Sequence, residues 1–104
     1  MSTQEKNKMI AEYMGLVIIT DDISFFDTNY KPLARYDKSW EALMPVVEKI
    51  SKNYSYYCSN DSGDWQVLID IYGINIVGVN IREVTYKAVV EFIQCYNKSK
   101  NDKA

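Results

Sequence analysis

One stretch of the sequence decides the fold: Tyr54-Ser-Tyr-Tyr-Cys-Ser-Asn-Asp-Ser-Gly-Asp-Trp-Gln-Val-Leu-Ile-Asp-Ile71. Residues 54–59 are rich in aromatic side chains, and the polar residues 60–64 that follow are a strong turn signal. We therefore expect a β-hairpin whose second strand covers residues 65–71. Gly73 permits a tight reversal into a further strand over residues 74–79, which completes a three-stranded meander.

The second strand of this meander alternates between two faces. One face carries Trp65, Val67, Ile69 and Ile71, and the other carries Gln66, Leu68, Asp70 and Tyr72. The first set predicts a buried face and the second a partly exposed one. Asp70 interrupts the apolar pattern, and an open sheet face is the simplest account of it.

Two helices are predicted before the meander. Ser2 and Glu5 have the spacing of a capping box, and the apolar stripe that follows them ends at Gly15. Between Asp37 and Lys52, apolar residues recur at steps of three and four: Trp40, Leu43, Met44, Val47 and Ile50. Pro45 falls inside this second segment, where it removes one backbone hydrogen bond. We expect a continuous but bent helix; the alternative is a regular helix that begins near Met44 after a looser turn.

A fourth strand and a third helix complete the expected fold. Leu16-Val-Ile-Ile-Thr20 is continuous and β-branched, which is typical of a central or doubly covered strand. Residues 23–36 have no sustained periodicity and predict a loop. The last helix is expected from about Arg82 to Asn97, followed by a polar, frayed tail over residues 98–104. The order αβαβββα predicts one α+β domain over residues 1–104, a compact sandwich of three helices on a four-stranded, largely antiparallel sheet.

Composition limits the classes of function. The chain is 47% hydrophobic and 25% charged, as in ordinary soluble domains, and its net charge of −2 provides no long-range attraction for nucleic acid or an anionic membrane. The first apolar run, residues 16–19, is far too short for a signal-peptide core or a membrane span, so we expect a cytoplasmic protein. Cys58 and Cys95 are expected to be buried free thiols.

No group is arranged for catalysis. Histidine is absent, which removes the commonest general base and metal ligand. Asp21 and Asp22 fit a strand-end turn, and Asp61 and Asp64 lack the rest of a calcium-loop ligand series. No serine lies in a nucleophile-elbow setting and no glycine cluster could hold phosphate. The sequence therefore predicts a protein with no enzymatic activity, no cofactor and no metal site.

Tyrosine is the residue type that points to binding. The chain has nine tyrosines, and tyrosine with arginine anchors many interfaces because a rigid ring buries a large area at low entropic cost. Some of these rings are expected only to complete a small core. The predicted interaction surface consists of Tyr30, Arg35, Tyr36, Tyr54, Tyr56, Tyr57 and Trp65.

Three segments carry a resemblance to a known family: Asn7-Lys-Met-Ile-Ala-Glu-Tyr-Met-Gly15, Ser39-Trp-Glu-Ala-Leu-Met-Pro-Val-Val-Glu-Lys-Ile50 and Tyr86-Lys-Ala-Val-Val-Glu-Phe-Ile-Gln-Cys-Tyr-Asn97. Their order and spacing resemble the phage ABA sandwich domain family, small phage and prophage proteins of unassigned function. The resemblance implies a compact α/β sandwich of phage or mobile-element origin, and it assigns no active site.

These observations lead to a functional expectation with two alternatives. We expect a non-catalytic accessory protein that binds and inhibits a host antiviral defence protein or ribonucleoprotein complex, in particular an RNA-guided nuclease, without sequence-specific nucleic-acid binding of its own. The first alternative is a sponge that traps a signalling nucleotide between aromatic rings. The second is a structural or assembly accessory of a phage.

Overall fold

The structure is a computed structural model that describes residues 2–15 and 35–102. Its elements, in chain order, are α1 (Thr3–Tyr13), α2 (Trp40–Asn53), β1 (Tyr56–Asp61), β2 (Asp64–Ile69), a 3-10 helix (Asp70–Tyr72), β3 (Ile74–Gly78) and α3 (Ile81–Asp102). The three predicted helices and the antiparallel meander are confirmed. The fourth strand, predicted at residues 16–20, lies outside the described residues, so four strands are not confirmed and the described sheet has three.

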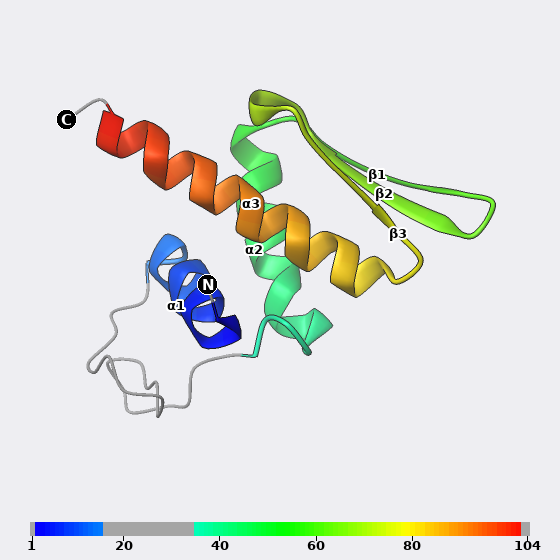
Figure 1. Cartoon of the computed structure of the whole chain (residues 1–104), viewed down its shortest axis with the longest axis horizontal. Coiled ribbons are helices and arrows are strands. Elements are labelled where there is room, and N and C mark those ends of the chain that lie inside the picture. The colour runs from blue at the N-terminus through cyan, green and yellow to red at the C-terminus, as the bar shows by residue number, and fades with distance from the viewer. Residues whose placement is uncertain (1, 16–34, 103–104) are drawn as a thin grey trace.

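All three helices lie on one side of the sheet (Figure 1). Helix α3 runs along the sheet and packs on β2 and β3, while α1 and α2 pack against α3. The core therefore forms in two layers, one between the sheet and α3 and one among the helices. Phe92 of α3 is fully buried at the centre of the second layer.

Local chemistry sets the start of each of the first two helices. Ser2 Oγ accepts a hydrogen bond from the Glu5 backbone N–H at 3.2 Å and donates to the Glu5 carboxylate, so the predicted capping interaction is present. Ser39 Oγ likewise accepts from the Ala42 N–H at 3.2 Å.

The proline does not interrupt the second helix. Helix α2 is continuous from Trp40 through Pro45, so the predicted continuous helix is confirmed and the alternative start near Met44 is wrong. The Glu41 carbonyl that loses its partner belongs to an exposed residue, so water can satisfy it. The predicted apolar face is shifted slightly, since Val46 is buried and Trp40 is 40% exposed.

The sheet has a covered face and an open one. Val67, Ile69 and Ile74 point toward α3 and are buried. On the opposite face Tyr57 is 58% exposed and Val77 is 59% exposed. The predicted burial of alternate residues is therefore confirmed for Val67 and Ile69.

The end of β2 differs from the prediction. The strand stops at Ile69 and the chain turns through the 3-10 helix into Gly73, which has the left-handed φ of +65° that the tight reversal needs. Ile71 is consequently exposed rather than on the buried face. Asp70 is exposed as well, in this helix rather than on the sheet.

Two further expectations are corrected. Cys58 is an exposed free thiol, because it lies on the edge strand β1 while α3 packs on β2 and β3. Helix α3 does not end at Asn97 but continues to Asp102, since each added residue of an existing helix gains a backbone hydrogen bond.

Candidate binding site

The residues predicted to form an interaction surface do not share one surface. Tyr36 is only 4% exposed and belongs to the core, and Tyr56 and Trp65 lie half-buried on the covered face of the sheet. Tyr57 points to the open face, because neighbouring residues of a strand point in opposite directions. Tyr54, at the end of α2, contacts Phe92. Arg35 is exposed and pairs with Asp37, whereas Tyr30 lies outside the described residues.

A hydrogen-bonded network around Asn7 ties the helices together. The Asn7 side chain, 4% exposed, donates from Nδ2 to Asp37 Oδ1 at 2.9 Å and accepts at Oδ1 from the Tyr86 hydroxyl at 3.0 Å. Arg35 donates to both Asp37 oxygens at 3.2 Å. The network links α1, α3 and the turn that leads into α2, and so fixes how the three helices meet.

The network shifts the pKa values of two of its members. Burial by itself would raise the pKa of Asp37, but hydrogen bonds from Arg35 and Asn7 outweigh it and hold that pKa below its usual value. Burial, with the negative charge of Asp37 as a smaller cause, raises the pKa of Tyr86 to about 12. Asp37 is therefore ionised and Tyr86 protonated at neutral pH, as their hydrogen bonds require.

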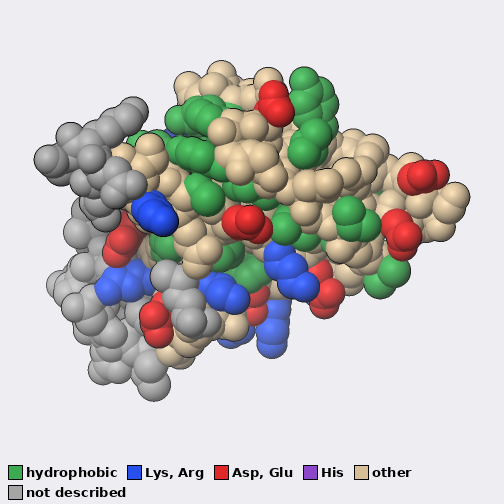
Figure 2. Space-filling model, turned by 45° about the horizontal axis from the view of Figure 1, so that its top comes forward, with side chains coloured by type: hydrophobic (Ala, Val, Ile, Leu, Met, Phe, Trp, Pro, Cys, Tyr) green, Lys and Arg blue, Asp and Glu red, His purple; other side chains and the backbone are tan. Residues whose placement is uncertain are grey.

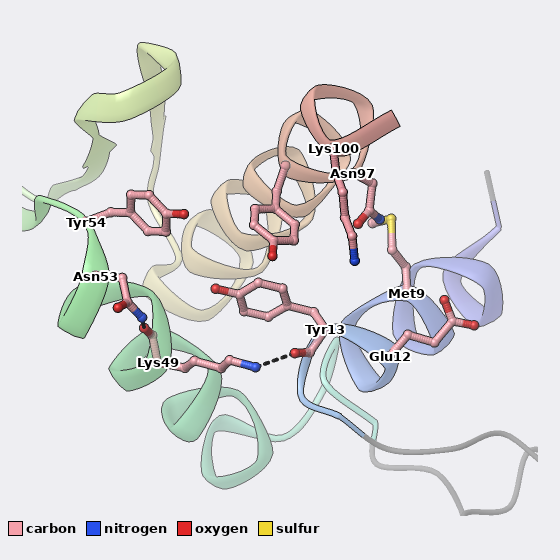
Figure 3. Close-up of a pocket in the computed structure, with 9 residues that line it drawn as sticks. Met9, Glu12, Tyr13, Lys49, Asn53, Tyr54, Asn97 and Lys100 are labelled. Carbon is pink, nitrogen blue, oxygen red and sulfur yellow. Dashed lines mark hydrogen bonds between the residues drawn. The ribbon is translucent and has the colours of Figure 1, made fainter. Parts of the chain in front are cut away.

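A cavity opens where the three helices meet, with a volume of about 470 Å³ (Figure 3). We call it the three-helix cavity. Its lining comes from every helix and consists of Met9, Glu12, Tyr13, Lys49, Asn53, Tyr54, Tyr96, Asn97 and Lys100. A neighbouring hollow of about 350 Å³ shares Tyr54, Tyr96 and Lys100 with it.

The aromatic wall of the three-helix cavity is built on Phe92. The ring centroids of Tyr13 and Tyr54 lie 5.8 and 5.2 Å from that of Phe92 in edge-to-face contacts, and Tyr13 meets Tyr96 at 5.4 Å with an interplanar angle of 84°. Such pairs add about 0.5–1.5 kcal/mol each beyond the area they bury. The rings are thus held by contacts with the core, and Figure 3 shows the rings of Tyr13 and Tyr54 on this wall.

The environment keeps the Tyr13 hydroxyl protonated. Burial, followed by the nearby hydroxyls of Tyr54, Tyr96 and Tyr72, raises the pKa of Tyr13 to about 12. At neutral pH this group can therefore donate a hydrogen bond.

Two lysines give the cavity its positive charge. Lys49 Nζ donates to the Tyr13 carbonyl oxygen at 2.5 Å and lies 4.5 Å from the centroid of the Tyr13 ring, so a hydrogen bond and a cation–π contact place it. Lys100 reaches into the cavity from α3 (Figure 3). No hydrogen bond or ion pair joins the Lys100 side chain to another residue in ranges 2–15 and 35–102. Glu12 is the acidic residue of the lining.

The open face of the sheet has a different chemistry. Tyr57, Leu68 and Asn75 form one row across the strands, and Ser59, Gln66 and Val77 form the next. Gln66 Nε2 donates to Asn75 Oδ1 at 2.8 Å across the strands. Residues 53–81 contain no Lys or Arg but include Asp61, Asp64 and Asp70. Figure 2 shows the end of the molecule that carries the β1–β2 turn. On the side in view, the described side chains at this end include acidic and hydrophobic ones, and none is basic.

Sequence reasoning missed most of the three-helix cavity. Tyr13 and Tyr96 fit the apolar stripes of their helices, and Lys49 and Lys100 have no local signal. One signal in the sequence points to the cavity. Tyr13 and Tyr96 each lie at the end of an apolar stripe beside a polar residue, as in Glu12-Tyr13 and Tyr96-Asn97. Each of the three segments quoted above for the family resemblance supplies part of the lining, so these segments contribute to a cavity as well as to the core.

No group of three or more His, Cys, Asp or Glu side chains that could hold a metal ion occurs within residues 2–15 and 35–102. In the same part of the chain, no helix has the length and apolar character needed to cross a membrane. Comparison of the chain with protein-family models, with curated proteins and with solved structures gives no match.

Proposed function

We propose that this protein is a non-catalytic inhibitor made by a phage or mobile element, and that it binds a host defence complex through the open face of its sheet. The target proposed first is an RNA-guided nuclease complex. The mobile-element origin depends on the resemblance of the three segments, whereas the mode of binding depends on the sheet. The observation that carries the proposal is an exposed aromatic and aliphatic face built from residues without a single basic side chain.

The apolar part of this face has the chemistry of an interface centre. Tyr57 stands opposite Leu68 in the register, and Val77 lies in the adjacent row. Tyrosine is enriched at the centres of protein interfaces, where a few such residues supply most of the binding energy, and the aliphatic neighbours help to exclude water. The Gln66–Asn75 pair can supply polar contacts between them.

The charge of the face favours a protein surface over a nucleic acid. Phosphate recognition requires Lys or Arg, which residues 53–81 lack. The three aspartates in that range complement a basic protein surface instead. A nuclease complex presents such a surface where it holds its guide and target, so occupation of that surface would inhibit it without catalysis.

The test measures target cleavage by purified RNA-guided nuclease complexes in the presence of the protein. We expect the wild type to inhibit cleavage and to elute with the complex in gel filtration. The double variant Tyr57→Ser, Val77→Thr should need at least about tenfold more protein for the same inhibition. Its fold should persist because both side chains are exposed.

The matched control is Trp40→Ser, which removes another exposed aromatic side chain at the start of α2, away from the sheet (Figure 1). It should inhibit as the wild type does. Absence of inhibition across a panel of nuclease complexes would reject the proposed target, and an equal loss in Trp40→Ser would reject the sheet face. Co-purification with virions would instead identify a structural or assembly accessory.

A further inference from the structure

We propose that the three-helix cavity binds a small anion that carries a flat ring, and that a nucleoside monophosphate is the class of ligand it takes. This site is separate from the open face of the sheet, and the inference does not depend on the proposed inhibition. Its volume of about 470 Å³ lies within the range of small-molecule sites.

Two lysines of the cavity lining supply the positive charge that would bind the anionic group of the ligand. Lys49 uses one of its three N–H donors on the Tyr13 carbonyl oxygen, which leaves donors for a ligand while holding the charge in place. Lys100 enters from α3 with its charge uncompensated by any described residue. Two cations against the single carboxylate of Glu12 make the lining positive, which favours a phosphate group.

The ring of the ligand lies against the tyrosine wall. Tyr54 and Tyr96 are fixed by contacts with Phe92, so little side-chain freedom is lost when a ring packs on them. Stacking on aromatic side chains suits any nucleobase, because every base has a π face. The protonated Tyr13 hydroxyl adds a hydrogen-bond donor on the same wall.

Two side-chain amides in the lining favour a ring with hydrogen-bonding groups on its edge over a hydrocarbon ring. Asn53 donates from Nδ2 to the Lys49 carbonyl oxygen at 3.2 Å, so its own carbonyl oxygen remains available to accept. Asn97 brings a second carboxamide from α3. A nucleobase has donors and acceptors along its edge that can pair with such groups, whereas a phenyl ring has none.

The experiment titrates the isotope-labelled protein with four probes and follows backbone amide shifts. We expect adenosine monophosphate and uridine monophosphate to bind saturably and to shift Tyr13, Tyr96 and Asn97. Inorganic phosphate and adenosine should each bind at least about tenfold more weakly, because each lacks one half of the recognised chemistry. Affinity for the monophosphates should fall as salt is added.

Two variants separate the two halves of the site. Lys100→Met should weaken binding of the monophosphates about tenfold. Tyr96→Leu should weaken the monophosphates by a similar factor but leave the affinity for inorganic phosphate unchanged. The control Lys98→Met makes the same change in charge on the same helix, at an exposed lysine outside the cavity lining, and should alter binding less than about twofold.

Three results would overturn the inference. They are the absence of saturable binding by either monophosphate, equal affinity for adenosine and its monophosphate, and an equal loss in Lys98→Met and Lys100→Met. The variant Tyr57→Ser, Val77→Thr should bind the monophosphates normally. The two proposals can therefore fail separately. Loss of nuclease inhibition would not contradict nucleotide binding in the three-helix cavity, and absence of nucleotide binding would not contradict protein binding by the open sheet face.

Discussion

At the scale of single residues, Asn7 has the most consequential polar contacts among the described residues. It is a short side chain in the first helix, yet it satisfies both the Asp37 carboxylate and the Tyr86 hydroxyl. Nothing in its local sequence indicates this, because its partners lie 30 and 79 residues away. Buried polar groups are tolerated only when hydrogen-bonded, so each member of this network depends on the others.

Replacement of Asn7 should therefore be costly. We expect Asn7→Ala to lower the free energy of unfolding by about 2–3 kcal/mol, because it leaves the part-buried Tyr86 hydroxyl without its acceptor and removes one hydrogen bond from the Asp37 carboxylate, which Arg35 still contacts. Denaturant unfolding monitored by tyrosine fluorescence measures this. The control Asn75→Ala breaks an exposed amide–amide hydrogen bond instead and should cost less than about 0.5 kcal/mol. Equal losses in the two variants would contradict the role given to the network.

At the scale of elements, the sequence was most informative where one local rule acts alone. Helical periodicity predicted all three helices, and the Ser2 and Gly73 signals fixed a helix start and a turn. The sequence pattern was misleading where two local rules compete. Asp70, Ile71 and Tyr72 continue the alternation of a strand, but the backbone has already turned into a 3-10 helix ahead of Gly73. The polar residues after Asn97 lack an apolar stripe, although the helix continues through them.

One residue of the β1–β2 turn can be replaced to stabilise the protein. Ser62 and Gly63 form its two-residue loop with φ of +54° and +92°, the positive pair typical of a type I′ turn. This left-handed backbone conformation costs serine free energy, whereas asparagine adopts it readily. We expect Ser62→Asn to raise the free energy of unfolding by up to about 1 kcal/mol in urea titrations. Ser59→Asn, in the middle of β1, should give no gain, and a similar gain there would mean that the turn is not the cause.

Gly78 lies where β3 comes close to α3. A Cβ at this position would lie 2.9 Å from Val84 Cγ2, and Val84 is buried. We expect Gly78→Ala to cost about 1–3 kcal/mol through overpacking, measured by thermal and urea unfolding. In the double variant Gly78→Ala, Val84→Ala the cost should be smaller than the sum of the two single costs, because the new methyl enters the vacated space. Simple additivity would contradict the close approach.

At the scale of the whole molecule, the candidate site could be predicted only in part. Tyr54, which the density of tyrosines singled out, lines the cavity, and Tyr57 is exposed on the open face of the sheet. Lys49, Tyr13 and Lys100 come together only because α1, α2 and α3 converge, and that convergence is set by long-range packing on Phe92 and by the Asn7 network. The same packing placed Tyr36 in the core, where sequence reasoning had expected a contact surface.

Alkaline unfolding tests this packing across the molecule. Burial raises the pKa values of Tyr13, Tyr56 and Tyr86 from 10 to about 12, and these residues belong to α1, β1 and α3. Because the folded pKa values are the higher ones, the stabilisation is complete below pH 10. It is lost as pH rises from 10 to 12, where the unfolded chain releases protons that the folded chain retains.

The test compares urea unfolding at several pH values for the wild type and for the double variant Tyr13→Phe, Tyr56→Phe. The variant should lose stability less steeply between about pH 10 and 12, because it lacks two of the three hydroxyls whose pKa is about 12 in the folded protein. Tyr57→Phe, which removes an exposed hydroxyl, serves as the matched control. Ultraviolet difference spectra report tyrosinate formation directly, so they show whether ionisation accompanies unfolding. An unchanged slope in the double variant would mean that these two rings are not protected by the packing described for α1 and β1.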